Sequence, residues 1–397
     1  MGNKHYVIIG GSVAAVNAAK AIRDHDEQAE ISIYGEEASL PYNRVKLSKG
    51  LFTDLHSDKI LIKKEKWFAN QRIHVYSGIK VTAIHAEDCT IETITGQTVA
   101  YDKLLLCTGA DNRKLLLDGA SLRNVHNIRF RQDADRLKTE LRQGERICII
   151  GGGIQGVETA WSFQQAGYAV TILEASHRLM PRQLDEKAAS ILNRRITDQG
   201  TEVRLGQGVK RITGTGHVEG VELQDGSVIP CEHVVYSIGI VPNTELARQT
   251  GLDIGHGILV NAQMKTSSAN IYAAGDVAEF QNRVDGLWES AIEQGKIAGA
   301  NMAGASVSYQ RPIPVTLSNS YESPLFSIGL VDEQECDTSL TSENQASYTR
   351  MFIQNGSICG VIGFGDALAS LPYKTAIIQG LKPDAPELTK IFGDKES

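Results

Sequence analysis

Short apolar runs followed by glycine and small residues recur along this chain. One run is Tyr6–Ile9 and another is Ile147–Ile150. Each has the length of a buried parallel strand, and each leads through a glycine-rich turn into a segment rich in small residues. The pattern predicts a strand, a tight turn and a helix at both places, so the chain carries the same nucleotide-binding pattern twice.

The second copy has every part of a dinucleotide-binding βαβ unit. Such a unit needs a tight turn, a backbone that can approach a pyrophosphate, and a helix N-terminus directed at it. Gly151, Gly153 and Gly156 occupy the three glycine positions, and the run Val170–Leu173 ends in Glu174. An acidic residue roughly twenty positions after the glycines receives ribose hydroxyls. We therefore expect a dinucleotide at this loop.

The charge of Glu174 also indicates which nicotinamide dinucleotide is preferred. A carboxylate at the ribose repels a 2′-phosphate, so we expect NADH to bind better than NADPH. Arg178 and Arg182 follow closely in the chain and weaken this preference.

The first copy is looser. Gly10 is followed by Ser12 and Ala15 at the second and third glycine positions. Serine still allows a close backbone approach, and alanine still permits tight packing of helix on strand. The acidic residue after the next strand is Glu36, with Glu37 as a nearly equal alternative. Two dinucleotides on one chain can exchange a hydride.

Composition excludes several other classes of protein. The chain has 397 residues, of which 42% are hydrophobic and 22% charged, and its net charge is −7. The length predicts two or three domains, and the acidic charge argues against nucleic-acid binding. We expect no membrane span, because no apolar run approaches about 20 residues. We also expect no signal peptide and a cytoplasmic location.

The cysteines do not indicate a metal site. There are six cysteines, with no pair at a metal-ligand spacing, and Cys107 and Cys148 fall in apolar runs. We expect these two to be inert buried thiols and the protein to bind no metal.

The order of the remaining motifs resembles that of a known superfamily, the FAD- and NAD(P)H-dependent reductases of the pyridine nucleotide–disulfide oxidoreductases. The resemblance spans essentially the whole chain. Besides the two glycine loops it rests on four segments, which are 101–110, 234–243, 266–276 and 293–301.

The resemblance implies an α/β fold with two Rossmann-like dinucleotide-binding domains and a small α+β C-terminal domain. The FAD-binding domain would comprise residues 1–112 and 239–318, with the NAD-binding domain, 113–238, inserted into it. Residues 319–397 would form the C-terminal domain, an interface to a second subunit or to an electron acceptor, so the protein would be a monomer or a homodimer. Asn355-Gly356 predicts a hairpin there, and a helix is expected from about Pro372 to Gly380.

The stretch from Pro41 to Lys49 narrows the branch. It resembles the corresponding stretch of rubredoxin- and ferredoxin-reductase-like members. Disulfide reductases and NADH peroxidases carry cysteines near the flavin, whereas this chain has none before Cys89. Electrons would therefore leave the flavin singly, to a small carrier protein such as rubredoxin. A basic patch would suit an acidic carrier, and candidate residues are Lys63, Lys64, Lys66 and Arg72, or Lys374, Lys382 and Lys390.

The resemblance also assigns roles to individual residues. Lys49 and Glu158 would form an ion pair beside the path of hydride transfer from NADH to the flavin. The alternative for Glu158 is an ordinary first-turn glutamate stabilised by the helix dipole. Asp276 would bind the ribityl chain and cap a helix. Asn319 and Tyr321 would border the flavin, and the other FAD-binding candidates are Arg44, Val81, Thr108, Gly109, Gly239 and Trp288.

Two further functions remain open at this stage. One is an NADH oxidase, or the NADH-oxidising part of a nitrite reductase system. The other is a non-catalytic flavoprotein in which bound nucleotide controls assembly, as in proteins like apoptosis-inducing factor.

Overall fold

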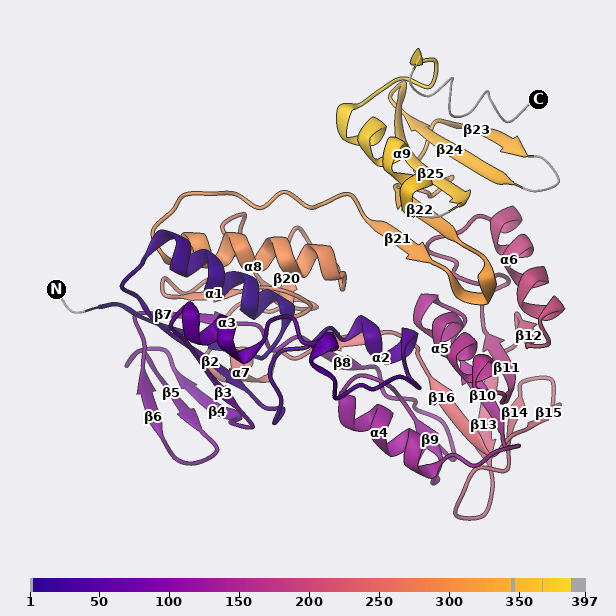
Figure 1. The fold of residues 1–397 in the computed structure, drawn as a ribbon, viewed down its shortest axis with the longest axis horizontal. Helices are drawn as coiled ribbons and strands as arrows, with labels where there is room; N and C mark the ends of the chain where they lie inside the picture. The colour runs from indigo at the N-terminus through magenta and orange to yellow at the C-terminus, as the bar shows by residue number, and fades with distance from the viewer. Residues whose placement is uncertain (1–2, 344–346, 366, 387–397) are drawn as a thin grey trace. The chain divides into compact units, whose positions relative to one another are not determined.

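The computed structural model describes residues 3–343, 347–365 and 367–386 (Figure 1). The chain divides into two compact units. The first contains the residues up to Arg44, Asp54–Arg113 and Gly239–Pro312. The second contains Val45–Thr53, Lys114–Ile238 and the described residues from Ile313 onward.

The first unit is built on a five-stranded parallel sheet in the order β19-β7-β1-β2-β3. Side chains alternate between its faces: Tyr6 and Ile8 enter one buried cluster, and Val7 and Ile9 enter another. Both faces of the sheet are therefore covered. Its strands are β1 (His5–Ile9), β2 (Glu30–Gly35), β3 (Ile73–Ser77), β7 (Lys103–Leu106) and β19 (Ile271–Ala273).

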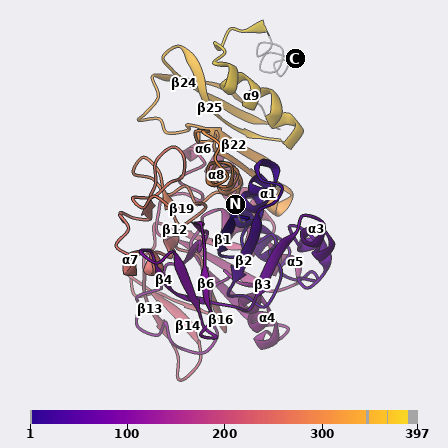
Figure 2. The ribbon, with the colours of Figure 1, turned by 90° about the vertical axis from the view of Figure 1, so that its left-hand side faces the viewer.

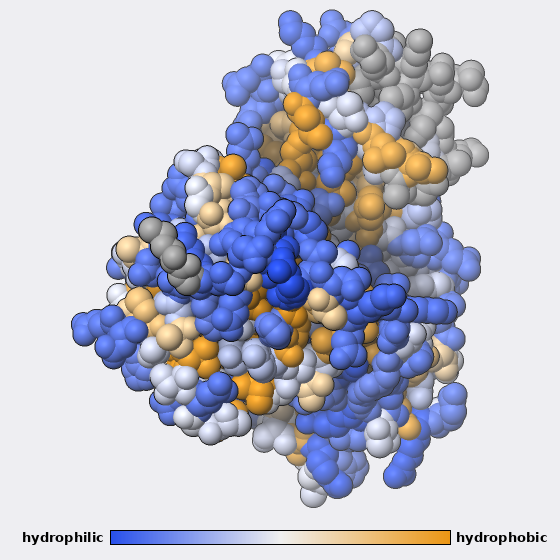
Figure 3. Space-filling view, turned by 60° about the vertical axis from the view of Figure 1, so that its left-hand side comes forward, coloured by the Kyte–Doolittle hydropathy of each residue, from blue (hydrophilic) through white to orange (hydrophobic). Residues whose placement is uncertain are grey.

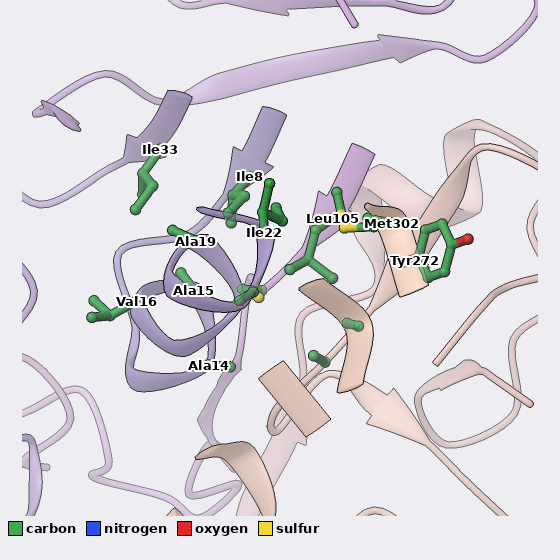
Figure 4. Close-up of a cluster of buried hydrophobic side chains, with 14 of the residues drawn as sticks. Ile8, Ala14, Ala15, Val16, Ala19, Ile22, Ile33, Leu105, Tyr272 and Met302 are labelled. Carbon is green, nitrogen blue, oxygen red and sulfur yellow. The ribbon is translucent and has the colours of Figure 1, made fainter. Parts of the chain in front are cut away.

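Two helices, α1 (Val13–His25) and α8 (Trp288–Met302), lie side by side on one face of this sheet (Figures 1 and 2). Small residues let their backbones meet. A Cβ added to Gly295 would lie 2.3 Å from the Ala14 carbonyl oxygen, so a larger residue would push the helices apart. Figure 4 shows Ala15 and Ala19 of α1 on the side of the helix that faces Ile8 and Ile33 of the sheet.

The opposite face packs on an antiparallel sheet of β4 (Val81–His85), β5 (Thr90–Thr93) and β6 (Thr98–Ala100). The smaller elements of the unit are η1 (Asp58–Ile60), α3 (Glu65–Asn70), α7 (Glu245–Gln249), the pair β8 (Ala110–Asn112) and β17 (Ile240–Pro242), and the pair β18 (Ile258–Leu259) and β20 (Ala278–Glu279).

The second unit repeats the parallel arrangement, in the order β12-β11-β10-β16-β9. A three-stranded antiparallel sheet, β13-β14-β15, lies between β12 and β16 in the chain. The two sheets contain β9 (Val125–His126), β10 (Arg146–Ile150), β11 (Ala169–Glu174), β12 (Glu202–Leu205), β13 (Val209–Thr213), β14 (Gly220–Leu223), β15 (Val228–Pro230) and β16 (His233–Tyr236). The helices are α2 (Val45–Lys49), α4 (Arg131–Glu140), α5 (Ile154–Gln165) and α6 (Glu186–Asp198).

Helix α2 belongs to this unit, although its position in the chain places it before residue 112. Its Ser48 carbonyl accepts a 2.7 Å hydrogen bond from the Ser162 hydroxyl on α5, and Phe52 packs edge-on against Phe163. The contacts with α5, which is distant in the chain, thus decide to which unit α2 belongs.

The C-terminal part of the second unit is an antiparallel sheet in the order β21-β22-β25-β24-β23, with one helix, α9 (Ala367–Gln379). The hairpin at Asn355-Gly356 is confirmed: both residues have positive φ, 52° and 74°. Figure 3 shows apolar side chains gathered at the top of the view, in this part of the chain. The strands are β21 (Val315–Ser318), β22 (Leu325–Gly329), β23 (Thr338–Glu343), β24 (Tyr348–Gln354) and β25 (Ser357–Phe364), with η2 (Ser320–Glu322) between β21 and β22.

Two boundaries differ from expectation here. Helix α9 begins at Ala367, so Pro372 lies inside the helix, where its ring removes one backbone hydrogen bond. Strand β21 pairs with β22, so residues 315–318 are part of this sheet and not of the preceding domain. Otherwise the α/β class with two Rossmann-like sheets and a C-terminal α+β domain is confirmed.

Candidate functional site

The second glycine loop has three glycines with three different surroundings. Gly151 has φ +111°, and a Cβ there would lie 2.2 Å from the Ser237 carbonyl oxygen. At Gly156 a Cβ would lie 1.9 Å from the Gly151 carbonyl oxygen. Gly153 faces open space, has extended backbone angles and stands at the N-cap of α5, where no side chain caps the helix. Two glycines therefore permit the turn, and the third leaves a helix N-terminus open to an anion.

Glu174 closes this loop from the end of β11. Its carboxylate accepts hydrogen bonds from the backbone N–H of Gly152, at 2.6 Å, and of Ser176, at 2.7 Å. The acid is thereby held beside the loop with oxygen lone pairs left for ribose hydroxyls. Arg178 donates to the carbonyls of Pro181 and Leu184, so its guanidinium is used locally. Arg182 is exposed and remains the candidate for a 2′-phosphate contact.

The first glycine loop has a similar backbone with a different cap. Gly10 has φ +113°, and a Cβ there would lie 2.1 Å from the Cys107 carbonyl oxygen. Ser12 is the N-cap of α1, and its hydroxyl accepts a 3.4 Å hydrogen bond from the Ala15 N–H. Serine at this position thus caps the start of the helix, as serine commonly does at an N-cap.

The acids after β2 have different partners. Glu36 is largely exposed, and one carboxylate oxygen lies 2.8 Å from the Lys80 ammonium. Glu37 is less exposed, pairs with Arg44 and accepts a 2.7 Å hydrogen bond from the Tyr42 hydroxyl. Arg44, one of the FAD-binding candidates, also stacks on the Tyr42 ring. A ribose could reach Glu36 by displacing an exposed ion pair, which costs little.

Lys49 and Glu158 form an ion pair, with the ammonium nitrogen 3.2 Å from a carboxylate oxygen. Glu158 is 5% exposed, and the Ser48 hydroxyl donates to its other oxygen at 3.2 Å. Burial raises the pKa of Glu158, and Lys49 and Ser48 oppose that shift. Lys49 also lies 3.4 Å from the Leu317 carbonyl oxygen. Glu158 is not in the first turn of α5, which removes the helix-dipole alternative.

The turns that leave and re-enter the first unit are joined to each other. The Thr108 hydroxyl donates to the Asn243 carbonyl at 2.8 Å, and the Arg113 N–H donates to the Gly239 carbonyl at 2.9 Å. Gly109 and Gly239 both have positive φ. Val81, another candidate, is buried in β4.

Asp276 does not cap a helix. It lies in the turn between β19 and β20, and α8 starts only at Trp288. The expectation fails because Val277 to Glu279 continue into a short strand instead. The turn is nevertheless tied to α8, since the Gly275 N–H donates to the Gln294 side chain at 2.8 Å. Trp288 is partly buried against the core under α1.

The side chain of Tyr321, a candidate for bordering the flavin, is 1% exposed within the second unit. Its hydroxyl donates to Thr201 at 2.9 Å, and its ring packs on Trp161. Its backbone is in the left-handed region, with φ 56°. The residue therefore has a packing role, and the neighbouring Asn319 has no side-chain cap contact.

Several functional contacts were not found from the sequence. Ser48 and Ser162 hold α2 to α5 and position Glu158, but isolated serines carry no spacing signal.

Cys107 and Cys148 are buried as expected, and burial raises the pKa of Cys107. Among the described residues there is no cluster suited to a metal and no helix able to span a membrane. Of the basic candidates, Lys390 lies outside the described residues, Lys64 pairs with Asp58 and Lys63 lies over Trp67.

Comparison with known proteins gives two family matches. Residues 4–295 match the pyridine nucleotide-disulphide oxidoreductase model, and residues 314–381 match the rubredoxin NAD+ reductase C-terminal domain.

Named relatives and solved structures agree with these matches. The rhodocoxin reductase of Rhodococcus erythropolis is 34% identical over 82% of this chain and 78% of its own length. The rubredoxin-NAD(+) reductase of Ectopseudomonas oleovorans is 31% identical over 77% of this chain and 82% of its own length. A Bacillus subtilis nitrite reductase is 30% identical over 92% of this chain, which spans only 46% of that relative. The structure of the NADH:rubredoxin oxidoreductase of Clostridium acetobutylicum superposes with a TM-score of 0.80 at 25% sequence identity. The superposition covers 99% of this chain and 100% of that protein's chain.

The match over more than half of the chain, together with the two glycine loops, shows that this protein belongs to the pyridine nucleotide-disulphide oxidoreductase family of enzymes, and that it carries a C-terminal domain of the rubredoxin reductase type.

Proposed function

We propose that this protein is an NADH-dependent FAD enzyme that passes single electrons to a small redox protein, with rubredoxin as the preferred carrier. The observation that carries the proposal is the presence of two dinucleotide-type glycine loops on a chain whose C-terminal segment matches the rubredoxin reductase domain. Residues 1–88 contain no cysteine, so a thiol relay near the flavin is not available in that part of the chain.

The residues of the first unit fit FAD. The turn at Gly10 and Ser12 starts a helix of small residues, which suits a pyrophosphate. We assign FAD binding to the first unit, residues 1–44, 54–113 and 239–312, with Glu36, Arg44 and Asp276 as its polar contacts. Bound FAD would supply the conversion of a two-electron input into one-electron outputs.

The residues of the second unit fit NADH. Gly153 leaves the α5 N-terminus open for the pyrophosphate, and Glu174 is held where a ribose diol can donate to it. The negative charge of Glu174 supports NADH over NADPH, and the exposed Arg182 limits that preference. We assign this NAD-binding domain to residues 113–238.

Lys49 and Glu158 are proposed to orient the nicotinamide during hydride transfer. A carboxylate that is buried and fixed by two donors keeps its position without reorganisation. Its partner Lys49 is 44% exposed, so the ammonium can move when a ligand arrives. The pair is expected to act on alignment, because hydride transfer needs proximity more than acid or base.

The first test follows the visible flavin spectrum during anaerobic mixing with NADH. Rapid bleaching that is reversed by oxidised rubredoxin supports the proposal, and a ferredoxin serves as the comparison carrier. Bleaching that reverses only when air is admitted would instead indicate an oxidase. A protein that binds flavin but does not bleach would refute NADH oxidation altogether.

A second test addresses the ion pair. Lys49→Ala and Glu158→Ala should each slow flavin reduction by NADH at least tenfold, about 1.4 kcal/mol in activation free energy. Lys46→Ala is the matched control, because Lys46 is exposed on the same short helix. Parental reduction rates in both ion-pair variants would show that the pair is only structural.

One other function has a specific observation in its favour. The chain aligns over 92% of its length with less than half of a Bacillus subtilis nitrite reductase, so it could serve as the NADH-oxidising component of a nitrite-reducing system. Nitrite-dependent recovery of the bleached flavin, after addition of a nitrite-reducing protein but not of rubredoxin, would favour that function.

A further inference from the structure

Two cysteines in the C-terminal sheet lie next to each other, away from both glycine loops in the chain. Cys336 is in the segment between β22 and β23, and Cys359 is on β25. Their sulfur atoms are 3.5 Å apart, although the residues are separated by 23 positions. Both are partly exposed and neither is in a disulfide, in contrast to the fully buried Cys107 and Cys148.

The backbone holds the two thiols together. The Leu330 N–H donates to the Cys359 carbonyl at 2.9 Å, and both sulfur atoms lie within 4 Å of the Leu330 carbonyl oxygen, at 3.9 and 3.8 Å. A Cβ on Gly360 would lie 1.8 Å from that same oxygen, so only glycine allows the segment to cross β25 here. A disulfide has sulfur atoms about 2.05 Å apart, so an approach of roughly 1.5 Å is sufficient.

We propose that Cys336 and Cys359 are a redox-sensitive dithiol, oxidised by a hydroperoxide to an intramolecular disulfide and reduced again by a thiol. In the first step a thiolate attacks a peroxide oxygen, which breaks the O–O bond and gives a sulfenic acid and hydroxide. In the second step the other thiolate attacks the sulfenic sulfur and displaces hydroxide. Two thiols and one hydrogen peroxide thus give one disulfide and two waters.

The surroundings of the two thiols set the speed of these steps. Burial raises the pKa of both thiols, to about 12 for Cys359. Asp332, Glu335 and Asp337 raise that of Cys336 further, against the hydrogen bond with Cys359. Because only the thiolate reacts, oxidation is slow at neutral pH and accelerates as the pH rises.

The segment that carries Cys336 is also bonded to β24, the strand whose side chains contact the start of α6. Its Glu333 pairs with Arg350, whose guanidinium donates to Asp185 at 3.1 Å. Asp185 is the N-cap of α6 and is bonded to the Tyr348 hydroxyl. A disulfide at Cys336 fixes this segment to β25, so the oxidised form resists unfolding of the C-terminal sheet.

The experiment treats the full-length protein with hydrogen peroxide and then maps its peptides without reduction. We expect a Cys336–Cys359 cross-linked peptide, a loss of two of the six titratable thiols, and a higher Tm that dithiothreitol reverses. The rate of cross-linking should increase with pH. Cys89→Ser is the matched control, because Cys89 is another partly exposed cysteine, and it should leave all these results unchanged.

Cys336→Ser and Cys359→Ser should each abolish the cross-link and the Tm increase. If a serine variant fails to fold, the peptide map of the peroxide-treated parental protein still decides whether Cys336 and Cys359 pair. If the parental protein, still folded by circular dichroism, loses thiols without this cross-linked peptide, the pairing is refuted. A disulfide that links Cys89 or two chains would also refute it.

Discussion

In the second glycine loop, two substitutions should affect different properties. Gly156→Ala should lower the stability of the fold, and Gly153→Ala should weaken dinucleotide binding. Alanine at Gly156 places its Cβ 1.9 Å from the Gly151 carbonyl oxygen. An ordinary contact begins at 3.4 Å, so backbone atoms of helix and loop must separate by about 1.5 Å. Overpacking of this kind costs about 1–3 kcal/mol.

Alanine at Gly153 behaves differently because its Cβ would meet nothing within 4 Å and its backbone is extended. We expect Gly153→Ala to change the free energy of unfolding by no more than about 0.5 kcal/mol. Its methyl group, however, occupies the approach to the α5 N-terminus. The KM for NADH should therefore rise about tenfold or more, equivalent to at least about 1.4 kcal/mol of lost binding.

The assay combines urea unfolding followed by circular dichroism with steady-state reduction of ferricyanide at varied NADH. Flavin content, read from the visible spectrum, must be unchanged in both variants. Gly156→Ala should lower the urea midpoint, and Gly153→Ala should raise the KM alone. An unchanged KM for NADH in a fully flavinated Gly153→Ala protein would refute the assignment of this loop to the pyrophosphate.

The remaining predictions concern specificity, packing and pH. In Glu174→Gln, kcat/KM for NADH divided by kcat/KM for NADPH should be at least tenfold lower than in the parental protein, because the charge that repels a 2′-phosphate is lost. A ratio equal to the parental one would contradict this. Gly299→Ala should destabilise the first unit by about 1–3 kcal/mol, since a Cβ there lies 2.2 Å from the Ala18 carbonyl oxygen. Calorimetry without NADH tests this, with Gly153→Ala as the control, because Gly153 has extended backbone angles and a Cβ there meets nothing within 4 Å. Equal transition temperatures in the two variants would contradict the prediction. Burial, followed by His233 and Arg136, lowers the pKa of His126 from 6.5 to about 3. The folded protein thus keeps this ring neutral while the unfolded chain protonates, so the free energy of unfolding falls as the pH drops from 6.5 towards 3, by about 1.4 kcal/mol per unit and at most about 5 kcal/mol. His126→Gln should flatten this slope in denaturant titrations at pH values in that window; a slope as steep as that of the parental protein would show that other groups cause it.

The glycine loops could be identified from the sequence because their chemistry is local. Gly10 and Gly151 need positive φ, and Glu174 lies at a fixed spacing from its loop. Those constraints act over one βαβ unit, and composition together with motif order then gave the α/β class and the family. The Lys49–Glu158 pair was expected only through resemblance, since no local rule joins residues so far apart.

The tertiary structure decided which groups meet. It paired Glu37 with Arg44, buried Tyr321 against Thr201, and placed Asp276 in a turn instead of at a helix start. It also brought Cys336 within 3.5 Å of Cys359. These outcomes depend on how strands from distant parts of the chain pack. The sequence by itself determined the loops and the class of fold, because backbone sterics and periodicity are encoded locally, whereas long-range packing alone determined the side-chain partners.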